Sequence, residues 1–599
     1  MINQKSIAVL PFVNMSNDID NNYFCDGITE EIINALTKVK GLKVIARTSS
    51  FAFKNKNADV RHIGNQLGVA TVLEGSIRIF NKRIRISVQL IRTNDGFQVW
   101  SQNFDRKLED IFELQDEISL IIAEQIRENF GHLDISKHIS IVGTKNINAY
   151  KLYLKGRAYQ LNWALDDYLE AIKCYKQSIA IDQNFYDAYF ALSRSYGILS
   201  SWGVIEKEDG RQKARTYLEE GLKINNTSYL GYFSESSLSF WNNWNYTKAL
   251  ETLKKSLHKN PSFAIAYEGI AEIYMATNQL DKALSNINKA IEISPLSPNH
   301  YFTKGNIYFL NKDYNKAISN LNECLRIDPN FTLAIETKLA CYMFLNDASN
   351  FNNYIATMPQ LIHPKLCETL FNLINIKPVD IQLDANTITI EEAFKSIYPW
   401  SFYFIIHACK TDEALAVFEE KMKLKVGQLV NFQLDPFLDP LRNHPRFQLI
   451  TKQTLSSGIR LPKEISSKAQ NSITKPLDAS EIIKYKWALE QFLKDSEPYL
   501  NPNLSLKELA NNIKLHPNKL SWLLNAEYDK NFNDFINQYR INHFKAIALN
   551  PEFKHVTILG LAYDSGFNSK SVFNTYFKKT EGTTPSQWVK AQNNRRRNT

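Results

Sequence analysis

The sequence contains few residues that interrupt regular structure and few that form cross-links. Its 599 residues include 21 Gly, 19 Pro and 6 Cys. Because no two cysteines stand in a C-x-x-C pair, the sequence favours reduced, buried thiols over a disulfide framework. It has no uninterrupted run of about 18 apolar residues, as a transmembrane helix needs, and its start lacks the apolar core of a signal peptide. We therefore expect a soluble protein of the cytoplasm.

Motifs that carry enzyme chemistry are also absent. The sequence contains no G-x-x-x-x-G-K-[ST] phosphate loop, no H-E-x-x-H zinc motif and no G-x-S-x-G nucleophile turn. Its 11 His are dispersed. Glu30 and Glu31 are adjacent carboxylates, but acids also suit the first turn of a helix, where they complement its dipole. We therefore expect no enzyme, no catalytic residue, no cofactor and no metal ligand; the remaining alternative is an enzyme with an unrecognised N-terminal site.

Aromatic residues and an uneven charge are what the sequence does have. The 28 Tyr and 35 Phe, with few breakers between them, indicate long helices packed by ring side chains. The formal net charge is +9, and residues 501–599 alone hold 14 Lys and Arg against 7 Asp and Glu. A local basic excess is typical of a protein that binds a polyanion. The three arginines at 595–597 alone could be only a solvated tail. The prediction that this region binds a polyanion therefore depends on the motifs in the rest of it.

The first 130 residues alternate between strand and helix patterns. Residues 71–80 and 83–92 alternate in polarity on either side of Asn81-Lys82, which predicts a hairpin. Further strands are expected at 5–12, 43–46 and 98–106, and helices at 29–39, 59–67 and 110–130. The 29–39 helix should open at Asp26-Gly27, with Glu30 and Glu31 in its first turn. We expect a mixed α/β domain over residues 1–130.

Several short motifs in this region carry a family resemblance. They are Ile7-Ala8-Val9-Leu10-Pro11-Phe12, Tyr23-Phe24-x-Asp26-Gly27-x-x-Glu30-Glu31, Arg47-Thr48-Ser49-Ser50-Phe51, Leu73-Glu74-Gly75-Ser76 and Trp100-x-x-x-Phe104-Asp105-Arg106. Together they resemble the TolB-like N-terminal domain, which is found beside tetratricopeptide arrays in bacterial regulators and adenylate-cyclase-like proteins. The resemblance implies a fold and says little about ligand or activity.

An internal repeat follows. Pro261, Pro295 and Pro329 are 34 residues apart, and alanines, other small residues and aromatics recur with the same period. This is the tetratricopeptide signature, in which stacked helix pairs bury one another's apolar faces. We expect repeats over residues 146–345, with a degenerate unit starting at Phe331. Residues 346–455 are then expected to form a helical cap, and residues 456–477, rich in Ser, Lys and Pro, an exposed linker.

Residues 478–592 contain two helix-turn-helix patterns, and residues 593–599 form a basic tail. The first pattern has helices near 505–512 and 518–526, and the second near 557–563 and 569–578. Gly566 supplies the positive φ that the second turn needs, whereas Lys514 stands at the equivalent place in the first. Ser569 can cap the helix that follows it. Between the patterns, residues 532–549 predict one stiff helix of roughly 27 Å, which can hold the two units about one DNA turn apart.

These residues resemble the AraC/XylS family of transcription regulators. The signature reads Ala562-x-x-x-Gly566-Phe567-x-Ser569-x-Ser571-x-Phe573-x-x-x-Phe577-Lys578-x-x-x-Gly582-x-Thr584-Pro585-x-x-Trp588, preceded by Asn531-Phe532-x-x-Phe535-Ile536-Asn537-x-x-Arg540-Ile541. The resemblance covers about residues 480–592. It implies that the second helix of each unit enters a major groove of DNA.

The predicted DNA-binding residues are those that the helical period turns away from the core. In the second unit Val572, Phe573 and Phe577 are expected to face inward. The residues expected to face DNA are Asn518, Lys519, Ser521, Trp522 and Asn525 in the first unit, and Lys570, Ser571, Asn574 and Lys578 in the second. Lys570 and Asn574 suit base edges, and Ser571 and Lys578 suit phosphates. Trp522 has an alternative place, packed on the helix between the units.

The sequence thus predicts a multidomain chain: an α/β N-terminal domain, an all-α tetratricopeptide superhelix and an all-α double helix-turn-helix domain. The expected function is a transcription regulator of the AraC type, with upstream domains that sense a signal or bind a partner. The alternative is a tetratricopeptide scaffold that uses its DNA-binding module only for localisation. Expected partners are double-stranded promoter DNA and, through the repeats, RNA polymerase or another protein, but no membrane. A homodimer is implied only by the habit of the family.

Overall fold

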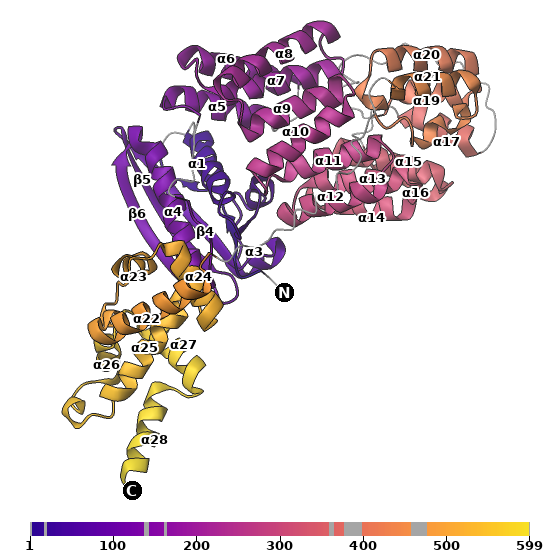
Figure 1. Cartoon of the computed structure of the whole chain (residues 1–599). Coiled ribbons are helices and arrows are strands. Elements are labelled where there is room, and N and C mark those ends of the chain that lie inside the picture. The colour runs from indigo at the N-terminus through magenta and orange to yellow at the C-terminus, as the bar shows by residue number, and fades with distance from the viewer. Residues whose placement is uncertain are drawn as a thin grey trace.

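The structure is a computed structural model, and it describes residues 3–16, 21–136, 143–160, 165–358, 364–375, 398–456 and 476–597. Figure 1 shows an α/β domain beneath a curved row of helix pairs, and a C-terminal helical domain that projects away from the sheet. This arrangement confirms the predicted fold class. Most of the predicted linker and the end of the basic tail lie outside the described residues. Within the described ranges, no helix has the length and apolar character that crossing a membrane requires.

The N-terminal domain is built on one mixed sheet with the strand order β3-β1-β4-β5-β6, and β2 pairs with β4 outside this path. The strands are β1 (Ser6–Val9), β2 (Val13–Asn14), β3 (Lys43–Val44), β4 (Thr71–Phe80), β5 (Arg83–Arg92) and β6 (Gln98–Lys107). Strand β1 is parallel to β3 and β4, whereas β4, β5 and β6 are antiparallel. Asn81 and Lys82, the two central residues of the predicted hairpin turn, have φ of 46° and 62°. Both therefore adopt the left-handed conformation that two-residue hairpin turns favour, and the predicted hairpin is present.

Four helices accompany the sheet: α1 (Asn21–Leu36), α2 (Arg47–Phe51), α3 (Val60–Leu67) and α4 (Ile111–Phe130). The predicted start of α1 is wrong, because the helix begins before Asp26 and therefore places Glu30 and Glu31 in its middle. Gly27 does not open the helix. It lies inside α1, at a position where a Cβ would come within 2.2 Å of Leu154 Cδ1 on the first repeat helix.

The repeat region stacks antiparallel helix pairs. They are α5 (Ile147–Gln160) with α6 (Leu165–Ile181), α7 (Tyr186–Ser201) with α8 (Lys207–Ile224), α9 (Tyr229–Ser237) with α10 (Tyr246–Lys259), α11 (Ala264–Ala276) with α12 (Leu280–Ile293), α13 (Pro298–Leu310) with α14 (Tyr314–Ile327), and α15 (Thr332–Phe344) with α16 (Ala348–Thr357). The degenerate unit that starts at Phe331 therefore forms a helix pair like the others. Ala249, Ala283 and Ala317, which share the 34-residue period, are each 0% exposed, since the helices approach closely where side chains are small.

The cap continues the array with α17 (Pro364–Asn375), α19 (Trp400–His407), α20 (Thr411–Lys423) and α21 (Pro445–Ser456). Its centre is Phe437, which stacks on Tyr403 with ring centroids 4.3 Å apart. The hydroxyl of Tyr403 donates a 2.5 Å hydrogen bond to Asp435. One buried cluster runs from the later repeats into these helices, so the cap shares the core of the array.

The C-terminal domain comprises α22 (Ala479–Ser496), α23 (Leu506–Asn512), α24 (Pro517–Tyr528), α25 (Phe532–Ile547), α26 (Ile558–Asp564), α27 (Lys570–Glu581) and α28 (Pro585–Arg597). One buried cluster holds α22 to α24 against the start of α25, and a second holds α26 and α27 against its end. Helix α25 has 16 residues, which makes it roughly 24 Å long. A single helix therefore joins two small cores.

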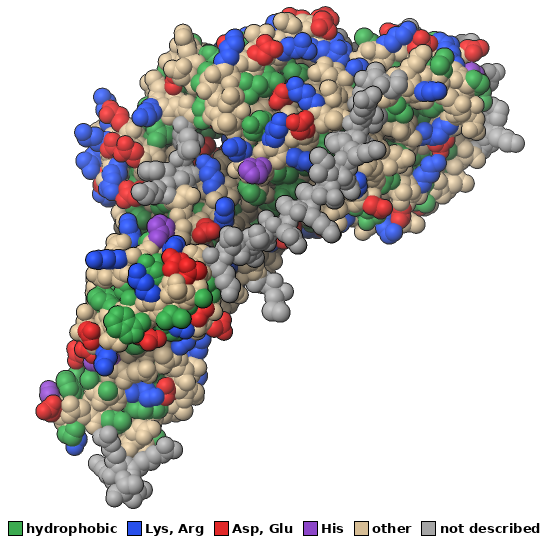
Figure 2. Space-filling model, viewed as in Figure 1, with side chains coloured by type: hydrophobic (Ala, Val, Ile, Leu, Met, Phe, Trp, Pro, Cys, Tyr) green, Lys and Arg blue, Asp and Glu red, His purple; other side chains and the backbone are tan. Residues whose placement is uncertain are grey.

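The N-terminal domain contacts both of its neighbours. Helix α1 packs on α5, and the turn before α13 bonds to α2 through Ser49, whose Oγ lies 3.0 Å from Ser294 Oγ and accepts from Leu296 N at 2.7 Å. The end of α4 meets the C-terminal domain. Figure 2 shows this domain as a separate lobe, with basic, acidic and hydrophobic side chains interspersed on the face in view. The α/β domain is thus the physical link between the repeats and the helix-turn-helix units.

Candidate nucleic-acid interface

The first helix-turn-helix unit consists of α23 and α24. Leu509 and Ala510 of α23 pack with Leu520 and Leu524 of α24 in the first buried cluster. The turn between the helices contains Lys514 with a φ of 54°. A lysine therefore adopts the left-handed conformation for which glycine is the ordinary residue, at a cost of about 1–2 kcal/mol. Leu515 N donates to the carbonyl oxygen of Ala510 in this turn, as Phe567 N does to that of Ala562 in the second unit.

The second unit consists of α26 and α27, and its turn contains Gly566 with a φ of 87°. A Cβ at this position would lie 2.2 Å from the carbonyl oxygen of Tyr499 and 2.9 Å from Leu500 Cα. The segment between α22 and α23 thus passes directly against the turn. Glycine is required here by the approach of another backbone as well as by φ.

The helix between the units is held by Arg540, a residue whose role the sequence pattern does not reveal. Its guanidinium donates hydrogen bonds of 2.8 Å to the carbonyl oxygens of Tyr499 and Asn501, and one of 3.2 Å to Asn537 Oδ1. Burial lowers the pKa of Arg540 to about 10. Because the same Tyr499 carbonyl contacts the Gly566 turn, this segment ties both units to α25.

Helix α27 is anchored to α25 by its inward face. Phe573 and Phe577 are buried in the second cluster, and Tyr576 donates a 2.6 Å hydrogen bond to the carbonyl oxygen of Asp534. Lys579 pairs with the Asp534 carboxylate at 3.2 Å, and Lys545 pairs with Glu581 at 3.0 Å. These contacts hold the C-terminal half of α27 against both the start and the end of α25.

The outward face of α27 is open. Lys570, Ser571, Asn574 and Lys578, the four predicted DNA-facing residues of this unit, are all exposed. The prediction that Val572 faces inward is wrong, since its side chain is 45% exposed and Tyr576 is buried instead. The reason is the helical period: positions three and four after Phe573 share its face, whereas the preceding residue is turned by about 100°. Ser569 precedes the helix but makes no capping bond, because its hydroxyl pairs with that of Ser571 at 2.8 Å.

The corresponding face of α24 is covered. Asn518, Lys519, Trp522 and Asn525 are half-buried, and the prediction that Ser521 is exposed is wrong, since it is 2% exposed. Lys519 lies 3.5 Å from Glu481 of α22. Trp522 packs against the first buried cluster of its own domain, which agrees with a packing role. That Trp522 also contacts DNA stays a prediction.

Helix α4 and the chain that follows it cover Asn518 and Asn525. Arg127 donates a 2.5 Å hydrogen bond to Asn518 Oδ1, while the backbone of Ile135 donates to Asn518 Oδ1 at 3.4 Å and accepts from its Nδ2 at 3.3 Å. The carboxylate of Glu128 accepts a 2.9 Å bond from Leu506 N. A Cβ on Gly131 would lie 2.8 Å from Asn525 Oδ1. The sequence signal that could have suggested this contact, a polar stretch at the end of α4, is not specific.

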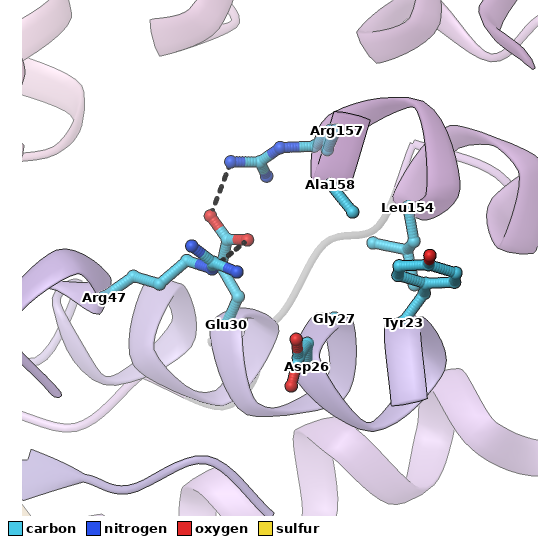
Figure 3. Close-up of a pocket in the computed structure, with 8 residues that line it drawn as sticks. All are labelled: Tyr23, Asp26, Gly27, Glu30, Arg47, Leu154, Arg157 and Ala158. Carbon is cyan, nitrogen blue, oxygen red and sulfur yellow. Dashed lines mark hydrogen bonds and ion pairs between the residues drawn. The ribbon is translucent and has the colours of Figure 1, made fainter. Parts of the chain in front are cut away.

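The junction between the N-terminal domain and the repeats is also polar. Figure 3 shows the Glu30 carboxylate of α1 between the guanidinium groups of Arg47 and Arg157. Arg157 donates to Glu30 at 2.7 Å, and Arg47 Nε lies 3.3 Å from the other oxygen. In the described ranges, no group of three or more His, Cys, Asp or Glu side chains is arranged to hold a metal ion. Glu30 is therefore part of the contact between these two domains.

Three parts of the chain match known families. Residues 3–121 match the family described as HilA/YgeH-like transcriptional regulator, second domain. Residues 509–591 match the family described as helix-turn-helix domain, and residues 152–185, 264–295 and 298–331 match tetratricopeptide repeats. The C-terminal and repeat matches confirm the resemblances found in the sequence. The TolB-like identity of the N-terminal domain stays a prediction, and none of the matched families is catalytic.

One curated relative overlaps part of the chain. A protein of Rhizobium meliloti (strain 1021) that is named as an adenylate cyclase is 43% identical over 188 residues, which make up 31% of this chain and 32% of that protein. The chain thus spans about a third of the length of the curated relative that it matches. That name was given to the whole of the other protein, about two thirds of which lie outside the match.

Solved structures resemble the chain only in part. PilF of Pseudomonas aeruginosa is 12% identical with a TM-score of 0.30, and the match covers 38% of this chain and 96% of that one. A thermophilic tetratricopeptide protein of Thermus thermophilus is 15% identical with a TM-score of 0.28, over 33% of this chain and 99% of that one. At TM-scores this low, neither structure bears on the function of this chain.

Proposed function

We propose that this chain, a transcription regulator with an AraC-type helix-turn-helix domain and tetratricopeptide repeats, binds promoter DNA sequence-specifically by placing α24 and α27 in adjacent major grooves. The observation that carries the proposal is the outward face of α27. Lys570, Asn574 and Lys578 follow one another at intervals of four residues, all exposed, on a helix whose opposite face is locked to α25. Such a face can donate to base edges and to phosphates at the same time.

Within this proposal the residues divide by chemistry. Asn574 is a bidentate partner for adenine, Lys570 donates to guanine, and Ser571 and Lys578 contact phosphates. The roughly 24 Å length of α25 is close to one turn of DNA, which suits two units that bind the same side of a duplex. In the first unit Asn518, Lys519, Ser521, Trp522 and Asn525 take the corresponding roles. No step of this function requires catalysis, a cofactor or a metal ion.

The proposal is tested by selecting binding sites for the full-length chain from a pool of random duplexes, then measuring affinity for an enriched duplex at several salt concentrations. We expect N574A to relax the preference at one position, at a cost of about 1–3 kcal/mol. We expect K578A to weaken binding to all sequences and to reduce the salt slope by about 1.

K452A is the matched control, because Lys452 is an exposed lysine on α21 of the cap. Its affinity and salt slope should equal those of the wild type. Equal affinity of the wild type for every duplex, with no enrichment, would contradict the proposal. Binding to promoter DNA also implies a place of action beside the chromosome, which for a regulator of this type is the cytoplasm.

A scaffold function is the second candidate, and the tetratricopeptide matches favour it. Part of the array already has an internal partner, because α5 and the turn before α13 both hold the N-terminal domain. An external partner, RNA polymerase or another protein, would therefore use surfaces that this domain leaves free. Substitutions on the repeats that abolish regulation while promoter occupancy stays intact would favour the scaffold; loss of occupancy would favour a sensing role.

A further inference from the structure

The two recognition helices differ in what covers the face that is proposed to enter DNA. On α27 the residues of that face are exposed. On α24 the same face contacts the N-terminal domain through Asn518 and Asn525. The two motifs are otherwise similar, but the DNA-facing surface of α27 is open to solvent, whereas that of α24 is in contact with another domain.

The occupied residues lie on one stripe of α24. Asn518, Ser521 and Asn525 are spaced by three and then four residues, so their side chains leave the same side of the helix. Both ends of the stripe meet the segment from Arg127 to Ile135, at Asn518 and at Asn525. Ser521 lies between those ends and is 2% exposed. The segment therefore contacts α24 at two points, Asn518 and Asn525, that lie about two helical turns apart.

The contact is polar, and the cores on its two sides are separate. Beside the Asn518 bonds, it includes the Glu128 bond to Leu506 N and a 2.9 Å bond from Asn533 Nδ2 to Asn129 Oδ1. The buried apolar cluster of the N-terminal domain contains no residue of the C-terminal domain, whose clusters contain only their own residues. A contact of this kind can be opened without unfolding either domain, as is typical of interfaces between domains in one chain.

We propose that the segment Arg127–Ile135 is an internal inhibitor that competes with DNA for α24, so that the full chain binds with both motifs only after this segment is released. The proposal rests on the proposed function. A helix is about 10–12 Å across and the major groove about 12 Å wide. A recognition helix in the groove therefore has no room for α4 on the same face, and the two contacts exclude each other.

The position of the inhibitor gives it an input. Helix α4 packs in the same buried cluster as α1, and α1 carries the Glu30 and Gly27 contacts to the first repeat helix. A partner that displaces the N-terminal domain from the repeats would shift the element that holds α24. The apparent affinity for DNA is proportional to the fraction of molecules in which α24 is open.

The test compares the DNA affinity of the full-length wild type with that of the full-length variant E128A/N129A, called the opened variant. Both bind the same duplex, which is enriched from a random pool by the opened variant. This variant removes two of the α4 contacts and leaves every proposed DNA-contacting residue in place; alanine also favours the helix. We expect it to bind about tenfold more tightly than the wild type, since the Leu506 N–H and the Asn533 amide lose their acceptors only in the closed state. Its DNase footprint should extend from one half-site to two, about 10 base pairs apart.

E113A is the matched control, because it removes an exposed carboxylate from the other end of the same helix; it should bind as the wild type does. Thermal unfolding of each variant tests whether both domains remain folded. If the opened variant, correctly folded, has the affinity and footprint of the wild type, the inference is overturned.

A second variant closes the contact covalently. N129C/N533C joins the two asparagine positions through a short bismaleimide, in a C409S background because Cys409 is the exposed cysteine among the six. The cross-linked protein should protect at most one half-site. Protection of both half-sites by the cross-linked protein would overturn the inference and leave the proposed function standing. If neither the wild type nor the opened variant enriches any sequence, the proposed function fails, and the inference fails with it.

Discussion

The side-chain oxygen of Asn518 accepts a 2.5 Å hydrogen bond from Nη1 of Arg127, a residue 391 positions earlier in the chain. Arg127 is 1% exposed, and burial lowers the pKa of its guanidinium. An amide at the start of a recognition helix, which suits the edge of an adenine, is thus engaged by the chain itself. The bond connects the domain expected to receive a signal with the residue expected to read DNA.

The Glu128 contact makes the closed state sensitive to pH. The pKa of Glu128 is raised to about 7, chiefly by burial and also by Glu124, against the lowering effects of the Leu506 N–H and Arg127. In the open state the carboxyl returns to its ordinary range. The closed state therefore binds the proton more tightly, so closure is favoured most in acid and weakens as the pH rises through about 7.

We expect the DNA affinity of the full chain to increase between pH about 5 and about 8 relative to that of E128Q, whose side chain cannot ionise. The measurement is fluorescence anisotropy on one enriched duplex across this range, with E113A as the control that keeps Glu128. Parallel pH profiles of wild type and E128Q would show that this carboxyl does not govern closure.

The close contact between Gly27 and Leu154 predicts a compensating pair of substitutions. G27A places a methyl group 2.2 Å from Leu154 Cδ1, so it should destabilise the junction of α1 and α5 by about 1–3 kcal/mol even though alanine favours helix. L154A removes the obstructing atoms. In a double-mutant cycle followed by thermal unfolding, G27A should cost less in the L154A background than alone. Strict additivity would mean that the contact does not constrain the helix.

The two turns of the helix-turn-helix units predict opposite responses to the same kind of exchange. G566A should destabilise the C-terminal domain by more than about 2 kcal/mol, because its Cβ meets the backbone of Tyr499 and Leu500 at positive φ. K514G should stabilise it by up to about 1 kcal/mol, since it relieves a left-handed lysine at some cost in chain entropy. Urea unfolding measures both. A destabilising K514G would show that Lys514 makes a contact that outweighs its strain.

Much of the chain was predictable because its signals are local. The hairpin about Asn81 and Lys82, the 34-residue spacing of Pro261, Pro295 and Pro329, and the glycine at 566 each specify backbone geometry within a short stretch. Errors arose where a pattern has more than one solution. The Asp26-Gly27 pair is a common helix start, yet here a leucine from another domain explains the glycine.

The candidate site was predictable as a set of helices and only partly as a surface. Phe573 and Phe577 were correctly expected on the buried face of α27. Val572 could not be placed from hydrophobicity alone, since an apolar residue next to the buried face can also be exposed to solvent. The position of Arg540 in the family signature did not reveal its role, because its main partners are backbone carbonyls that any residue supplies.

By itself, the order of amino acids determined the three kinds of architecture, the repeat period and the two helix-turn-helix units, because periodicity, turn residues and apolar spacing act over a few neighbouring positions. Only the tertiary structure decided that the outward face of α27 is open, while Asn518 and Asn525 on α24 are contacted by the end of α4 and the chain that follows it. Accessibility depends on which distant surfaces meet, and polar contacts between residues hundreds of positions apart leave no periodic trace in the chain.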